Sequence, residues 1–225
     1  MITALRSRAK LELNRLALDP YCKLYLPLRK LDGDSFMSKD AYGHLCTNYG
    51  SLWTPQGRSF DGVDDYVDCG NKPSLDLTKW TIEFWTRVNV NKDYNGFVIK
   101  GLDGSENWEI LGQGDGTVIL TTKFTDGTRG ELITPADTII TGEWAHFVYT
   151  YDQAQGRRFY RNSSLIAEDT ESKTPKTTTE PLYIGNEKGV TRFLDGLIGE
   201  VCIYSRDLTL QEILCHYLVG KEMFG

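Results

Sequence analysis

Short runs in which core-forming and polar residues alternate are the feature that most constrains the fold of this chain. In TIEFWTRV (81–88), Ile82, Phe84 and Val88 fall on one face of an extended strand, and the residues between them fall on the other. HFVYTYD (146–152) alternates in the same way. Many short strands of this kind predict an all-β fold, an antiparallel β-sandwich.

Turn signals separate these runs. Asp-Gly pairs occur in GDGT (114–117) and TDGT (125–128), and Asn162-Ser163 interrupts RRFYRNSSLIAE. Such pairs favour tight hairpins between antiparallel strands. SKTPKTTTEP (172–181) predicts a polar loop, because the strand pattern resumes directly after it.

The two ends of the chain predict helices. Near the N-terminus, Leu5, Ala9, Leu13 and Leu16 recur at near-helical spacing among basic residues. This predicts an arm over residues 1–20, which either packs on its own domain or docks on a partner through Leu5, Leu13 and Leu16. Residues 21–225 form the sandwich domain.

A short C-terminal helix is predicted over DLTLQEILCHYLVG (207–220). Thr209 and Glu212 have the spacing of a capping box, and Gly220 is the expected stop.

The composition of the chain argues against several classes of function. A net charge of −6 argues against a general binder of nucleic acids or anionic membranes. The chain has five cysteines without a C-x-x-C pair, and we expect free thiols in a reducing cytosol. The first 20 residues mix Arg and Lys with Leu and lack the apolar core of a signal peptide, so secretion by that route is not expected.

Several segments, in order, resemble the laminin-G-like, concanavalin A-like jelly-roll domains. The similarity covers Leu24 to Tyr217, and the segments that carry it are SKDAYGHLCTNYGSLW, QGRSFDGVDDYVDCG, KWTIEFWTRV, GEWAHFVYTYD, FYRNSS and LYIG…FLDGLIGEVCIYSRDLTLQEI. The resemblance implies two stacked sheets of about six or seven strands each. It also implies a binding module, often for glycans, and often a structural calcium ion.

Catalysis is not expected. Glucanases that share this fold carry E-x-D-x-E on one strand, which places two carboxylates on the same face, and this motif is absent here. Asp64 and Asp65 are adjacent, so on a strand they would point to opposite faces. The three histidines lie far apart in the sequence, with no nucleophile at a motif spacing.

Calcium binding is the more plausible use of the aspartates. Asp61, Asp64 and Asp40 are the expected ligands, because a hard cation needs six to eight oxygens from carboxylates and loop carbonyls. Gly199 weakens this expectation, since the family often has an Asp at that position. The alternative is that these aspartates form turns by accepting local backbone amides.

Glycan binding requires an exposed aromatic ring beside polar groups. Trp108 and Tyr94 lie in or beside polar, turn-like stretches, and Trp85 shares a strand face with charged residues. These three are the expected ligand-binding residues, and the alternative for each is packing in the interior.

Two functions remain open at this stage. The first is a non-catalytic module that binds carbohydrate or another surface ligand while displayed on a larger assembly, such as a virion decoration, fibre or receptor-binding subunit. The arm would attach the module to capsid or tail subunits, or to sister subunits, in which case the module forms a homo-oligomer. The second is a structural cement that binds no glycan. The expected location is the virion surface after synthesis in a host cytoplasm, with extracellular exposure as the alternative.

Overall fold

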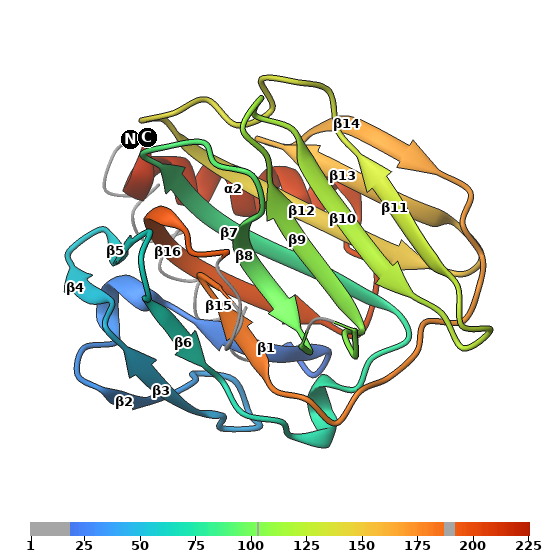
Figure 1. Ribbon diagram of the computed structural model, residues 1–225, viewed down its shortest axis with the longest axis horizontal. Helices are drawn as coiled ribbons and strands as arrows, with labels where there is room; N and C mark the ends of the chain where they lie inside the picture. Colours follow the sequence, from blue (N-terminus) through green and yellow to red (C-terminus); the bar gives the residue numbers. More distant parts are fainter. Residues whose placement is uncertain (1–18, 103, 187–191) are drawn as a thin grey trace.

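The computed structural model describes residues 19–102, 104–186 and 192–225, and shows three layers (Figure 1). Two antiparallel eight-stranded sheets stack on each other, and one helix covers the outer face of the first. Sheet A consists of β1 (Cys22–Leu26), β4 (Leu52–Thr54), β5 (Gly57–Asp61), β7 (Trp80–Val88), β12 (Trp144–Asp152), β13 (Gly156–Arg161), β14 (Ser164–Asp169) and β16 (Asp195–Tyr204). Sheet B consists of β2 (Ser35–Met37), β3 (Leu45–Tyr49), β6 (Tyr66–Asp68), β8 (Asn95–Lys100), β9 (Trp108–Gly112), β10 (Val118–Lys123), β11 (Arg129–Ile133) and β15 (Leu182–Ile184).

The all-β sandwich predicted from the alternation is confirmed. Sheet A runs in the order β14-β13-β12-β7-β16-β5-β4, with β1 also paired to β16, and sheet B runs β11-β10-β9-β8-β15-β6-β3-β2. Each sheet therefore has one or two strands more than the resemblance implied. Two of the edge strands, β2 and β4, have only three residues each, which suits an edge that must not pair with another chain.

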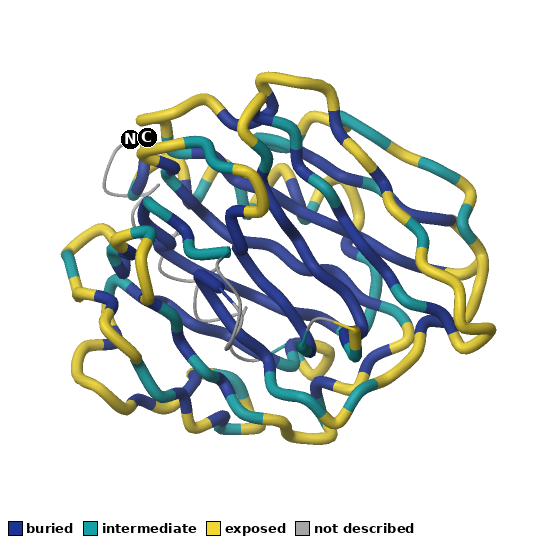
Figure 2. Tube along the Cα trace, viewed as in Figure 1, coloured by how far each residue is buried: buried dark blue, intermediate teal, exposed yellow. Residues whose placement is uncertain are grey.

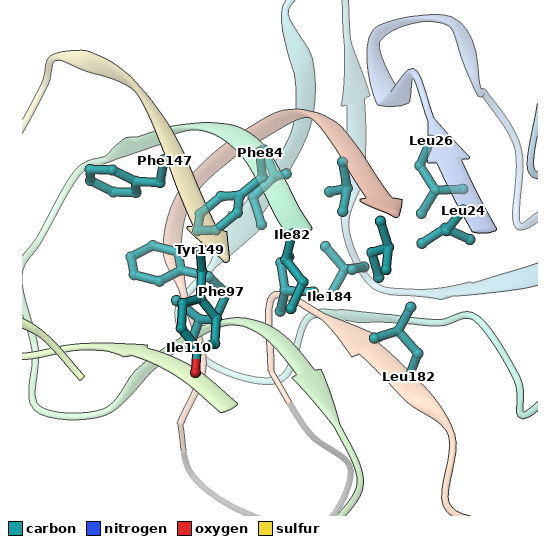
Figure 3. Packing of buried hydrophobic residues seen from close by; sticks show 14 of the residues in the cluster. Leu24, Leu26, Ile82, Phe84, Phe97, Ile110, Phe147, Tyr149, Leu182 and Ile184 are labelled. Atoms are coloured by element: carbon teal, nitrogen blue, oxygen red, sulfur yellow. The ribbon is translucent and has the colours of Figure 1, made fainter. Parts of the chain in front are cut away.

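The core lies between the sheets and follows the predicted alternation. Ile82 and Phe84 of β7 point inward with Phe147 and Tyr149 of β12, and all four are at most 1% exposed. Figure 3 shows them facing residues of sheet B such as Phe97. The burial colours of Figure 2 show the long central strands buried and the connecting loops exposed. Alternation alone therefore identified the inward faces of the two longest predicted strands.

The predicted turns are also present. Residues 113–117 join β9 to β10, residues 124–128 join β10 to β11, and Asn162 and Ser163 close the β13–β14 hairpin with φ of +50° and +66°. Left-handed backbone at both central positions is what a two-residue hairpin with a type I′ turn requires. The stretch SFDGVDDYVDCG forms β5, a turn and β6, and its Phe60 and Val67 are buried as packing residues.

The C-terminal helix, α2 (Leu210–Phe224), begins with the predicted capping box. The expected stop at Gly220 is wrong, because the helix continues through it to Phe224. A Cβ at Gly220 would lie 2.2 Å from Nε1 of Trp85. The glycine is therefore a contact point, which lets the helix backbone approach sheet A closely enough to cover the Trp85 ring.

Residues 1–18 of the predicted arm lie outside the described residues, which begin at Asp19, so the helix of the arm stays a prediction. Among the described residues, no helix combines the length and apolar character that crossing a bilayer demands.

Candidate functional site

The β7–β8 loop carries the most unusual exposed aromatic residue of the described chain. Tyr94 is 47% exposed and has a left-handed backbone, with φ of +65°. Such a conformation is a genuine outlier for a bulky side chain, and residues held this way cluster at binding sites. The Arg192 guanidinium lies 5.3 Å from the centre of its ring. This cation–π contact gives the exposed ring a charged neighbour that can donate several hydrogen bonds.

Two hydrogen bonds to sheet B fix the position of Arg192. Its Nη1 donates to Oε1 of Glu109 over 3.0 Å, and Glu109 is fully buried on β9. The carbonyl of Arg192 also accepts from the amide of Gly96 over 2.8 Å. The arginine is thus anchored on sheet B while its planar group faces Tyr94.

The neighbouring β5–β6 loop carries an acidic group. Carboxylate oxygens of Asp61, Asp64 and Asp65 all lie within 4.8 Å of one another. Lys92, from the loop that carries Tyr94, donates from Nζ to the carbonyl of Gly62 over 3.2 Å. The acidic group and Tyr94 therefore belong to adjoining loops at one end of the sandwich, which the arrowhead of β7 marks in Figure 1. We call these two loops, with Arg192, the rim.

Burial distinguishes Asp65 from its two exposed neighbours. It is 5% exposed and accepts a hydrogen bond from the amide of Asp61 over 2.9 Å. Burial raises the pKa of its carboxyl, and the charges of Asp61 and Asp64 add to that rise. A bound cation would remove this repulsion, so the residues present fit a hard cation such as calcium.

The third predicted ligand, Asp40, serves another purpose. Its carboxylate accepts hydrogen bonds from the amides of Tyr25, Tyr42 and Gly43 over 2.8 to 3.1 Å, which fixes β1 against the loop between β2 and β3. Among the described residues it does not join the acidic group at the rim, and Asp65 takes its place. The sequence placed Asp65 in the same acidic stretch but did not select it as one of the three expected ligands.

Two of the three aromatic candidates are not exposed. Trp108 is 1% exposed in the core, with its ring centre 6.2 Å from that of Trp80. Trp85 is 4% exposed because α2 covers it, and its ring stacks on that of Phe224 at 5.0 Å. The expectation of an exposed ring is therefore wrong for both tryptophans, and Tyr94 alone meets it.

The space beneath α2 holds a polar cluster that sequence reasoning missed. Glu83 of β7 accepts from the hydroxyl of Tyr204 over 3.1 Å and from Nδ1 of His216 over 3.0 Å, and Nε2 of His146 lies 3.5 Å away. Two histidines 70 positions apart in the sequence thus meet at one carboxylate. The available signal was the placement of Glu83 and His146 on the outer faces of predicted strands, opposite the core.

A second carboxylate, Glu200 of β16, completes this cluster. Its Oε2 accepts from the hydroxyl of Tyr25 over 3.2 Å. Glu83, Glu200, His146 and His216 line a small pocket with a free volume of about 10 Å³, close to the space of one water molecule.

The two glutamates titrate in opposite directions. Burial raises the pKa of Glu200, and the charge of Glu83 raises it further, to about 7. Burial also acts to raise the pKa of Glu83, but the charge and hydrogen bond of His216, with His146, outweigh it and hold that pKa well below its usual range. Burial lowers the pKa of His216, but the charge and hydrogen bond of Glu83, with the charge of Glu200, outweigh it and raise that pKa. Below about pH 7, Glu83 is therefore ionised while Glu200 is still neutral.

Comparison with known proteins agrees with this architecture. The sequence profile of the concanavalin A-like lectin/glucanases superfamily matches residues 61–214, which is more than half of the chain. No curated protein matches the sequence.

Several solved structures share the fold at low sequence identity. The binding domain of Paraclostridial Mosquitocidal Protein 1 aligns with a TM-score of 0.71 and 16% identity, over 88% of this chain and 52% of that one. The receptor-binding domain of botulinum neurotoxin D gives 0.69 and 13%, over 89% and 53%. The binding domain of botulinum neurotoxin DC, solved in complex with SialylT, gives 0.71 and 14%, over 88% and 51%. The chain thus spans about half the length of these proteins, and the likeness concerns the fold.

Proposed function

This chain belongs to the concanavalin A-like lectin/glucanases superfamily, and from that premise we propose that it is a non-catalytic module that binds a glycan or another cell-surface ligand at its rim. The observation that carries the proposal is Tyr94, which is half-exposed, has a left-handed backbone and makes a cation–π contact with Arg192. Sugars place their C–H faces on aromatic rings, and a nearby guanidinium can donate to their hydroxyls.

The structural neighbours support a binding role. Those three are binding or receptor-binding domains of toxins, and one was solved in complex with SialylT. Because Arg192 is already paired with the buried Glu109, the proposal rests on the exposed ring of Tyr94, and a glycan is the ligand class we propose first.

The buried glutamates do not favour catalysis. Glu83 and Glu200 face a pocket of about 10 Å³ beneath α2, and a glycosidic bond with its two sugar rings cannot enter a space that suits one water molecule. We therefore propose a structural role for this pair.

The finer proposal is that the module is displayed on a larger assembly, such as a virion, after synthesis in a host cytoplasm. All five cysteines, which lie in the described part of the chain, are free thiols, as suits folding in a reducing compartment. Display of many copies would raise the avidity of a weak single site. Extracellular exposure by another route is the alternative location, and a structural cement without glycan binding is the alternative function.

Replacing Tyr94 with glycine tests the proposal at the rim. We expect glycan binding to weaken about fivefold or more, because the stacking surface is lost and, by analogy, the stacking of one nucleic-acid base on an aromatic ring is worth about 1 to 3 kcal/mol. We also expect thermal stability to be retained, because glycine adopts φ of +65° without strain. A glycan array followed by titration calorimetry measures the first effect, and calorimetric unfolding measures the second.

Tyr94→Phe is the matched control, since it keeps the ring and removes only the hydroxyl. If the array finds no ligand for the wild-type protein, with or without calcium, the structural-cement alternative takes the place of this proposal. If Tyr94→Gly binds as tightly as wild type, the site lies elsewhere on the module.

Calcium at the rim is a separate proposal. Asp61, Asp64 and Asp65 would supply carboxylate oxygens, and loop carbonyls would complete the shell. We expect added calcium to raise the unfolding temperature, with a stabilisation of about 2.7 kcal/mol when the free ion is at 100 times its dissociation constant. Asp64→Asn should abolish the shift, whereas Asp126→Asn, in an exposed turn elsewhere, should retain it. An equal calcium response in wild type and Asp64→Asn would contradict this assignment.

A further inference from the structure

The outward side of α2 carries an apolar stripe. Leu210, Leu214 and Leu218 are 64%, 38% and 53% exposed, respectively. Residues four apart lie on one side of a helix, one turn above the other, so the three leucines form a continuous line. We call these three residues the leucine stripe.

The stripe is not the face that holds α2 on the sandwich. Ile213, Gly220 and Phe224 are the buried residues of the helix, and Phe224 packs on Trp85 of sheet A. A surface helix needs one apolar face toward its own core. The leucine stripe is a second apolar face, and an exposed line of leucines indicates a surface that another segment covers.

The described chain begins next to this helix. Oδ2 of Asp19 accepts from Nη2 of Arg206 over 2.7 Å, and the same Nη2 donates to Glu212, in the first turn of α2, over 2.8 Å. Tyr21, 52% exposed, lies under the Arg206 guanidinium at 5.8 Å. Residues 1–18 therefore join the module beside the first turn of α2, where the stripe starts.

We propose that the leucine stripe is the docking site of the chain's own residues 3–17. The sequence of this segment spaces Leu5, Leu13 and Leu16 along one side of a helix. As a helix it would be about 22 Å long, and the stripe is about 12 Å long at 1.5 Å per residue, so one segment covers all three leucines. A short amphipathic helix is marginal alone and gains its stability from such a contact.

Charge favours the same occupant. Residues 1–18 contain four basic residues and one acidic residue, a net charge of +3, while the whole chain carries −6, so the remaining residues carry −9. A segment attached at Asp19 is also present at a high effective concentration near α2. Once docked, the arm is not free to anchor the module, so display on an assembly would then use another surface.

Limited trypsin digestion of the full chain tests this docking. The arm offers cleavage sites after Arg6, Arg8, Lys10 and Arg15. In the wild-type protein we expect slow cleavage there, and in the double variant Leu214→Gln/Leu218→Gln we expect cleavage about tenfold faster or more, because the docked state loses its apolar contacts. Glutamine is a good helix former, so α2 itself should persist. Leu13→Gln, on the arm, should have the same effect.

Leu165→Gln is the control, since Leu165 is 46% exposed on β14 and its replacement should leave the rate unchanged. Light scattering should show a monomer for wild type and variants alike. Equal arm cleavage in wild type and the double variant, with an unchanged unfolding temperature, overturns the proposal. A wild-type dimer that the stripe variant dissociates also overturns it, because the occupant is then a second copy.

Discussion

Trp108→Ala should lower the free energy of unfolding by about 3 to 5 kcal/mol, the cost of removing a large aromatic side chain from a well-packed core. The ring is 1% exposed and lies between the two sheets, within 6.2 Å of Trp80. For a domain of 150 to 250 residues, this corresponds to a fall of roughly 6 to 20 °C in the unfolding temperature. Calorimetric or urea unfolding measures the loss.

Trp108→Phe is the matched variant, because it leaves a ring in the same space and should cost less than Trp108→Ala. The folded fraction of either variant should bind the ligand of the rim as wild type does. A stability loss below about 1 kcal/mol for Trp108→Ala would contradict the core position. Loss of glycan binding without loss of stability would restore Trp108 to the binding site.

The burial of Trp108 shows where sequence reasoning fails on this chain. Its neighbours in SENWEILGQGDG are polar, which favours an exposed turn. The structure places it on β9, a strand with neighbours on both sides in sheet B, and even Glu109 of that strand is fully buried beneath Arg192. Glu109 pairs with Arg192, 83 residues away, and with Arg129 on β11, 20 residues away, and no local pattern contains either distance.

Local signals succeeded where the structure depends on local geometry. The alternation of β7 and β12, the Asn162-Ser163 turn and the capping box at Thr209 were all predictable, because each is set within a few residues. The prediction that Gly220 ends the helix was wrong because the role of this glycine depends on its contact with Trp85 of β7. Tyr94 was chosen for its polar surroundings, but its strained backbone and its contact with Arg192 required the fold.

Glu83 and Glu200, which lie beneath α2, should respond to substitution with opposite signs at pH 8. Glu200 has a pKa of about 7 in the folded protein, against 4.5 when solvated. Between these values the folded state binds more protons than the unfolded state, so stability falls as pH rises through about 7. The shift corresponds to roughly 3 kcal/mol. Glu200→Gln keeps a neutral acceptor and should be roughly 2 to 3 kcal/mol more stable than wild type at pH 8.

At pH 5 the same variant should lie within about 1 kcal/mol of wild type, because Glu200 is then neutral in the folded protein and the pH is just above its unfolded pKa of 4.5. This makes the pH 5 measurement an internal control for packing. His216 adds to the slope in the same direction, since its pKa is raised in the folded state and its contribution is lost as pH rises through that raised value.

Glu83→Gln should instead destabilise the protein by about 3 to 5 kcal/mol at pH 8, because it removes the buried ionised acceptor of the hydrogen bonds from Tyr204 and His216, each worth about 1.5 to 3 kcal/mol. The depressed pKa of Glu83 contributes stability above its unfolded pKa of 4.5, and that contribution is lost as pH falls toward the folded value. The deficit of the variant should therefore shrink in acid. Urea unfolding of both variants at pH 5 and pH 8 measures these effects. Changes of the same sign at pH 8 would contradict the opposite pKa shifts of the two carboxylates.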